Sequence, residues 1–281
     1  MPSVLISALM SLFWLRVAVF LYGVASLAVL PAALYDRPRW RHVALPATVA
    51  ALFFHFVSLA EMLLAAHHRI PVDVGEVQAL LGLLLAAGFL VTYWRYRSLS
   101  IGVAVLPVVF LLGLLPAFAS GHATMQSPLL RSGWIWLHIA LLLAAYAALI
   151  VSMLASIFYL VQEKRLKSRS KAGLHSTLPA LETTDQIALR SLLFGLPCMT
   201  AGLLIGSLIA QETYGSAYFR DPKVLLSFAM WIAYIAMIAI RKSAGLRGRR
   251  AVFLSTFVFF VMIFVWAANQ FSSVHQYAVK P

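Results

Sequence analysis

The chain alternates between long apolar runs and short segments that are charged or rich in proline and glycine. Eight apolar runs occupy residues 8–34, 43–66, 77–94, 101–119, 134–161, 191–210, 223–240 and 251–271. Each is close to the ~20 residues that an α-helix needs to cross the hydrocarbon core of a bilayer. The pattern therefore predicts an all-α fold, a polytopic membrane bundle of eight transmembrane helices that forms a single membrane domain over residues 1–281.

Composition narrows the class of protein further. Of the 281 residues, 62% are apolar and 11% are charged, whereas soluble domains average about 25% charged residues. This excludes a water-soluble enzyme and a disordered chain, and we expect the lipid bilayer as a partner and no nucleic acid. The single cysteine, Cys198, excludes an intramolecular disulfide and a C-x-x-C-H heme attachment site, so the chain is not itself a c-type cytochrome.

The basic residues predict an orientation in the membrane. Sixteen Lys and Arg residues fall in the loops after the first, third, fifth and seventh runs, and five fall on the other side. Short cytoplasmic loops carry an excess of Lys and Arg, so both termini are expected to be extracytoplasmic in a multi-pass protein of the bacterial cytoplasmic (inner) membrane. The net charge of +13 is then explained by topology. The polar stretch at 162–190 is too short to fold alone and is expected to lie along the inner membrane surface.

Five of the eight histidines fall at the predicted outer face. His138 lies about one turn into the run 134–161 and His275 follows the last run, so both reach the same depth. Two neutral imidazoles at one depth can be the axial ligands of a heme iron or can bind a transition metal. The alternative is that they are interfacial histidines bonded to water, headgroups and loop carbonyls. A metal enzyme or transporter built on His67, His68 and His122 would lack carboxylates at ligand spacing.

Two charges fall inside predicted spans. Arg16 and Glu61 both lie about six residues from the outer ends of antiparallel neighbours, and an unpaired charge inside the membrane costs about 2.5 kcal/mol or more. We therefore expect an ion pair, or else an Arg16 that binds a heme propionate and is oriented by Glu61. His55 precedes Glu61 by six residues and lies on another helix face, which argues against a metal site in that span. Gly202 and Gly206 form a small-xxx-small pair that is typical of close helix packing.

The segment SPLLRSGWIWLHIALLLAAYAALIVSMLASIFYLVQEKRLK (127–167) has a histidine near the start of a helix, a downstream tyrosine and a basic end. With GLPCMTAGLLIGSLIAQETYGSAYFRDPK (195–223), GLRGRR (245–250) and VHQY (274–277), it resembles the cytochrome c assembly protein family. That family handles heme in membranes and includes CcsA, CcmC and HemX types. The matching residues are His138, Tyr146 and the basic residues between Lys164 and Lys167, and the resemblance covers residues 127–281.

The family carries an outer loop of the form W-G-x-x-W-x-W-D-P-K-E, whose tryptophans form a platform for heme. Residues 214–224 read Y-G-S-A-Y-F-R-D-P-K-V here, so the glycine and Asp-Pro-Lys are kept and the three tryptophans are replaced by Tyr214, Tyr218 and Arg220. The resemblance implies that the tyrosines pack on a porphyrin face and that Arg220, next to Asp221, pairs with a propionate. This degenerate motif in a short chain is closest to the HemX-type branch.

The resemblance implies a heme-binding protein of cytochrome c biogenesis or heme homeostasis that has no enzymatic turnover of its own. It would hold a non-covalent, b-type heme at the outer face through His138 and His275, with His122 as a substitute ligand and Arg16 toward a propionate. Other cytochrome c assembly or membrane proteins would be its partners. The alternative is a heme-free accessory or regulatory subunit that keeps the scaffold and binds another membrane protein such as a transporter, and the loss of the tryptophans favours this alternative.

Overall fold

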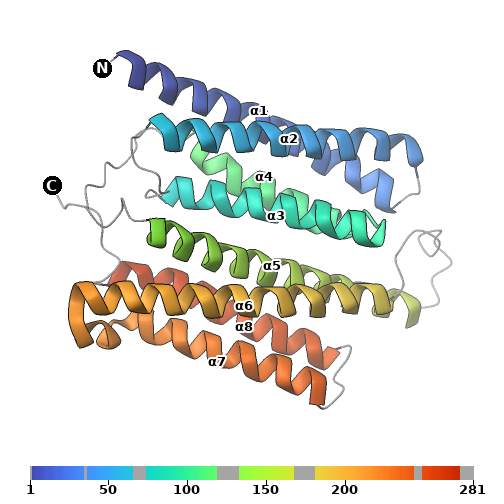
Figure 1. Ribbon diagram of the computed structural model, residues 1–281. Coiled ribbons are helices and arrows are strands. Elements are labelled where there is room, and N and C mark those ends of the chain that lie inside the picture. The colour runs from blue at the N-terminus through green and yellow to red at the C-terminus, as the bar shows by residue number, and fades with distance from the viewer. Residues whose placement is uncertain are drawn as a thin grey trace. The chain divides into compact units, whose positions relative to one another are not determined.

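The computed structural model describes residues 2–34, 37–65, 74–118, 133–167, 181–243 and 249–272, and all regular structure in these ranges is helical (Figure 1). The helices are α1 (Pro2–Leu34), α2 (Pro38–Ala65), α3 (Val74–Tyr96), α4 (Gly102–Phe118), α5 (Gly133–Lys167), α6 (Leu181–Tyr214), α7 (Pro222–Ser243) and α8 (Arg249–Ala267). Two short 3₁₀ helices, η2 (Gly215–Arg220) and η3 (Ala268–Phe271), follow α6 and α8.

Each of the eight predicted apolar runs is a helix. Seven of the described helices are long and apolar enough to span a membrane, and α4 is an apolar helix of 17 residues. Where the structure describes the polar stretch at 162–190, residues 162–167 continue α5 and residues 181–190 begin α6. Its location along the inner membrane surface stays a prediction. A helix satisfies its own backbone hydrogen bonds, so it can continue past the membrane boundary without a partner surface.

The chain forms two compact units. The first comprises the described parts of residues 1–122 and 161–184, and the second those of residues 123–160 and 185–281. The first unit thus holds α1–α4 with the last turns of α5 and the first residues of α6. The second holds most of α5 and α6 with η2, α7, α8 and η3. Whether the two units form the single membrane domain predicted for the whole chain depends on how they associate, and the single domain stays a prediction.

In the first unit, α1 packs against α2 and α4, and α3 packs against α2 and α4. Two glycines of α4 allow the close approach: a Cβ at Gly102 would lie 2.7 Å from the ring of Phe89, and one at Gly113 would lie 2.8 Å from Val19. Real Cβ contacts are not that short, so α4 packs with its backbone against α1 and α3. The Arg41 guanidinium donates to the Tyr93 hydroxyl and ties the start of α2 to the end of α3.

In the second unit, polar side chains join α6 to its neighbour α7 at three depths. The Trp231 indole donates to the Thr200 hydroxyl over 2.9 Å, and the Tyr234 hydroxyl donates to the carbonyl of Leu192 over 3.1 Å. Nearer the start of α6, Arg241 and Asp185 form an ion pair of 2.7 Å. The residue numbers of the α6 partners fall while those of the α7 partners rise, so α6 and α7 are antiparallel.

The outer surface of α8 is apolar and aromatic. Phe253, Phe257 and Phe264 are 72%, 62% and 64% exposed and follow one another at the spacing of one helix face. A soluble monomer rarely leaves so continuous an apolar surface in water. Lipid is the solvent that suits this face, which agrees with the membrane-spanning reading of the apolar runs.

Candidate functional site

His138 lies at the contact between α5 and α6. It is the sixth residue of α5, is partly buried, and its Nδ1 lies 2.7 Å from the carbonyl oxygen of Gly202 on α6. Within the described part of the chain, its Nε2 makes no hydrogen bond. The Lys223 ammonium, near the start of α7, is close enough to act electrostatically on the imidazole. The imidazole is therefore held through Nδ1, while Nε2 makes no hydrogen bond to the described residues.

The segment between α6 and α7 turns sharply at Gly215. Gly215 has φ of +59°, a left-handed conformation in which glycine has no steric cost, and it ends α6. The 3₁₀ helix η2 follows and carries two of the predicted site residues, Tyr218 and Arg220. Tyr214 is 40% exposed and Arg220 is exposed, so both side chains are accessible from outside the packed unit.

Tyr218, whose ring the resemblance implies to face a porphyrin, is buried in this structure. It is 4% exposed and packs with Ala210 and Val224, so its ring joins η2 to the end of α6 and the start of α7. Phe219 is the exposed aromatic residue of the turn, at 49%, and its ring centroid lies 4.2 Å from that of Tyr218. Tyr218 therefore supports the turn from beneath in this structure.

Asp221 is the residue that starts α7. Its Oδ1 accepts hydrogen bonds from the backbone N–H groups of Lys223 and Val224 at 3.0 and 3.3 Å, which is the geometry of a helix N-cap. Pro222 occupies the first helical position, where its missing N–H has no cost. The Asp221 Oδ2 accepts from the Ser272 hydroxyl at 2.9 Å, so the carboxylate predicted to border a heme site is occupied in tying the start of α7 to the end of η3.

Arg16 does not form the expected ion pair. Its Nε donates to the carbonyl oxygen of Ala117 over 3.0 Å, and its guanidinium lies 5.7 Å from the ring of Phe118. The last carbonyls of a helix have no partner within it and carry its negative dipole end, so a cation at the end of α4 is stabilised there. Glu61 keeps one buried carboxylate oxygen without a hydrogen bond. The ion-pair prediction was wrong because equal depth does not set the direction in which two side chains point.

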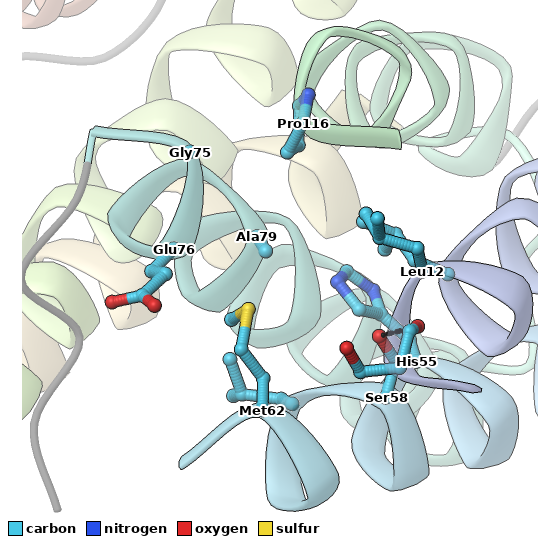
Figure 2. Close-up of a pocket in the computed structure, with 11 residues that line it drawn as sticks. Leu12, His55, Ser58, Met62, Gly75, Glu76, Ala79 and Pro116 are labelled. Atoms are coloured by element: carbon cyan, nitrogen blue, oxygen red, sulfur yellow. Dashed lines mark hydrogen bonds between the residues drawn. The ribbon is translucent and has the colours of Figure 1, made fainter. Parts of the chain in front are cut away.

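A second buried histidine lies in the first unit. His55 is 1% exposed, its ring meets that of Tyr22 edge-on at 5.8 Å, and neither of its nitrogens has a hydrogen-bond partner among the described residues. It lines a cavity of about 20 Å³ that also touches Ser58, Met62 and Glu76. Figure 2 shows residues of α1–α4 around this cavity, with the Glu76 carboxylate directed away from the His55 ring. This volume holds about one water molecule, and it is too small for heme.

The remaining predicted histidines, His67, His68, His122 and His275, lie outside the described residues. Among those that are described, no group of three His, Cys, Asp or Glu side chains could hold a metal ion. The residues that sequence reasoning missed as part of the site are Gly202 and Gly206, which were read only as a packing motif. Their depth along the helix could have indicated them. His138 lies about 8 Å from the start of α5, and Gly206 lies about 12 Å from the end of α6, which runs antiparallel to α5.

The likeness to known proteins extends over nearly the whole chain. The family described as "Cytochrome C assembly protein" matches residues 43–273. The chain belongs to the cytochrome c assembly protein family. The resemblance expected for residues 127–281 therefore also reaches back through α2, α3 and α4.

Relatives of this family member carry the name cytochrome c biogenesis protein CcsA. The protein of that name from Prochlorococcus marinus subsp. pastoris is 25% identical over 290 residues, which cover 94% of this chain and 92% of the relative. In a second Prochlorococcus marinus strain the identity is 30% over 64% of this chain and 65% of the relative. In Guillardia theta it is 29% over 53% of this chain and 56% of the relative. The assignment to a HemX-type branch stays a prediction.

Proposed function

We propose that this protein works in cytochrome c biogenesis and holds heme at the outer face of the bacterial cytoplasmic membrane, with His138 as one axial ligand. The observation that carries the proposal is the bonding of His138. Its Nδ1 is engaged by the carbonyl of Gly202 while its Nε2 has no partner among the described residues. Histidine ligands of metals usually donate their second ring N–H in this way. The donor set therefore fits a heme iron, which when bound would supply the electron-accepting centre that a cytochrome needs.

His275 is the proposed second ligand, and the anchoring of the chain just before it supports this. Ser272 is tied to Asp221 at the start of α7, and Lys223, two residues after Asp221, acts electrostatically on His138. His275 follows Ser272 by three positions in the sequence and lies outside the described residues. Its role as the second ligand is proposed from this place in the chain.

The proposed outer-face location rests on the cations, considered within each unit. In the second unit, the end at which Asp185 pairs with Arg241 also carries four more basic residues: Arg190, Lys242, Arg249 and Arg250. The opposite end, with η2, carries Arg220 and Lys223. The rule that cations favour the cytoplasmic side then supports an outer-face location for His138 and η2. We propose the same side for both chain termini, as the distribution of cations along the sequence predicts.

Arg220 and Tyr214 are the residues of the turn best placed to meet a heme in this proposal. Both are accessible, and a guanidinium binds a carboxylate such as a propionate through two parallel hydrogen bonds. The protein would bind b-type heme without a covalent link, because one cysteine cannot make a thioether pair. We propose no turnover of its own. Other assembly proteins of the membrane would be its partners. The roles of His122 and Arg16 toward heme stay predictions from the sequence.

A heme-free accessory subunit is the second candidate function, and one observation favours it. This chain keeps the aspartate of the family loop as Asp221 and replaces one tryptophan by Tyr218. The capping of α7 explains Asp221, and packing explains Tyr218. A scaffold that had lost heme and bound another membrane protein, such as a transporter, would keep the same residues.

The heme content of four variants separates the two functions. We expect the purified parent protein to contain heme, and we expect His138→Ala, His275→Ala and the double variant to lose it or to change its spectrum. His67→Ala is the control, because it is also an expected outer-face histidine. A parent protein with heme whose spectrum is the same in all variants would contradict the ligand assignment, and a parent protein without heme would favour the accessory subunit.

A further inference from the structure

The His138 ring lies so close to the backbone of Gly206 that a residue with a side chain would not fit at this position. A Cβ at this position would lie 2.3 Å from Cε1, 2.5 Å from Nδ1 and 3.2 Å from Nε2 of His138. Contacts below 3.0 Å do not occur at real Cβ atoms, so any side chain at residue 206 would displace the imidazole. The ring thus lies directly on the bare backbone of α6.

Helix geometry explains why this bare position lies next to the hydrogen bond. In an α-helix the carbonyl of residue i points toward the N–H of residue i+4, so the carbonyl of Gly202 points along the helix toward Gly206. A side chain at i+4 normally shields that carbonyl from the side. Because residue 206 has none, the second lone pair of the Gly202 oxygen is open to the imidazole, at 2.7 Å from Nδ1.

This bond fixes where the imidazole proton sits. A carbonyl oxygen only accepts hydrogen bonds, so Nδ1 must carry the proton that is donated to Gly202. In the neutral ring, Nε2 then carries the lone pair that a metal ion requires. The two glycines therefore set both the tautomer and the orientation of the ring.

We propose that Gly202 and Gly206 are positioning residues of the heme site: the carbonyl of Gly202 holds the His138 ring as its Nδ1–H tautomer, and Gly206 leaves the room in which the ring presents Nε2 to iron. This inference rests on the proposed function of His138 as an axial ligand. It assigns to this small-xxx-small pair a role beyond helix packing. It also predicts that substitution by alanine affects heme binding more at Gly206 than at Gly202.

The two glycines differ because their neighbours differ. A Cβ at Gly202 would lie 2.9 Å from Cδ2 and 3.0 Å from Cγ of Leu142, and the Leu142 side chain can move away by a change of rotamer. A Cβ at Gly206 would meet the ligand ring itself. We therefore expect Gly206→Ala to lower the heme content per folded protein at least fivefold and Gly202→Ala to lower it less than twofold.

The direct test replaces the His138 side chain by free imidazole. In His138→Gly, the space against Gly202 and Gly206 is open, and we expect added imidazole to restore the parent heme spectrum. The probe for the hydrogen bond is 1-methylimidazole, which can bind iron through its free nitrogen but has no N–H to donate to Gly202. Since one hydrogen bond contributes about 0.5–1.5 kcal/mol net, half-restoration is expected to need a roughly two- to tenfold higher concentration of 1-methylimidazole.

A double variant keeps the test independent of folding. His138→Gly with Gly206→Ala removes the ring that the new Cβ would displace, so it has room to fold, but the Cβ occupies the place of the added imidazole. We expect imidazole to restore this variant at least fivefold less well than His138→Gly alone. Gly133→Ala is the matched control on α5, because a Cβ there meets no atom of the described residues within 4 Å, and its heme content is expected to equal that of the parent.

The outcomes separate this inference from the function on which it rests. Equal restoration by imidazole and 1-methylimidazole, or full restoration of the double variant, would overturn the positioning role while His138 remains a ligand. A His138→Gly protein that keeps the parent spectrum without imidazole, or a parent protein without heme, would overturn the proposed function and this inference with it.

Discussion

Replacement of Asp221 by alanine tests whether the carboxylate of the family motif serves the fold or the ligand. The substitution removes an N-cap with two backbone donors, at a cost of about 1 kcal/mol (0.5–2). It also removes the acceptor of the buried Ser272 hydroxyl, and a hydrogen bond to a charged group contributes about 1.5–3 kcal/mol. Together these predict that Asp221→Ala lowers the free energy of unfolding by about 2–5 kcal/mol.

Unfolding in mixed micelles of a mild detergent and SDS, followed by circular dichroism, measures this loss. Ser272→Ala removes one of the three bonds, the one to the charged carboxylate, and is expected to cost about 1.5–3 kcal/mol. Asp221→Asn keeps an oxygen for the cap but offers an amide to Ser272, so it should fall between the two. Glu212→Ala is the control, because this acidic residue near the end of α6 is exposed, and exposed substitutions usually change stability by less than about 0.5 kcal/mol.

The heme content of the same variants decides the reading. If Asp221 acts through the cap, heme per folded Asp221→Asn protein should match the parent protein. An Asp221→Ala protein that unfolds at the parent SDS concentration and yet lacks heme would refute the structural role, and it would make the carboxylate part of the ligand site.

Three further substitutions test the packing of the two units by the same unfolding measurement. Asp185→Ala leaves Arg241 buried without its partner and should lower the free energy of unfolding by about 3–5 kcal/mol. Adding Arg241→Met should recover part of this loss, because the arginine side chain is 2% exposed and the aspartate side chain 18% exposed. A double variant no more stable than Asp185→Ala would contradict the pairing. His55→Leu should cost less than about 1 kcal/mol because the imidazole makes no hydrogen bond, whereas a loss above about 3 kcal/mol would reveal a bound partner. Arg16→Met should cost about 1–2 kcal/mol through its bond to the end of α4, and rescue of that loss by Glu61→Gln would mean that the two charges do pair.

The eight helices could be predicted from the sequence because lipid imposes one dominant constraint. A span must be apolar and about 20 residues long, so apolar runs mark the spans directly, and Pro222 and Gly215 mark a start and an end by their backbone preferences. The extra ten residues at the start of α6 were missed because a helix that continues into water needs no apolar pattern.

The site could be predicted less well because a sequence gives depth but not direction around a helix axis. Depth placed Arg16 beside Glu61, yet Arg16 points to the end of α4. Depth also predicted His138 near the outer end of its span, but nothing in the apolar pattern indicated that its ring packs on Gly202 and Gly206 of α6. The resemblance to a family supplied the loop residues, and only the packed structure separated the buried Tyr218 and capping Asp221 from the accessible Tyr214 and Arg220.

The optical spectrum of the detergent-purified parent protein, with and without dithionite, tests the central claim most directly. Bound heme with two histidine ligands predicts a sharp Soret band and resolved α and β bands on reduction, which His138→Ala should lose or shift. A protein that folds and remains monodisperse in detergent but shows no absorption beyond that of its aromatic residues would contradict the account.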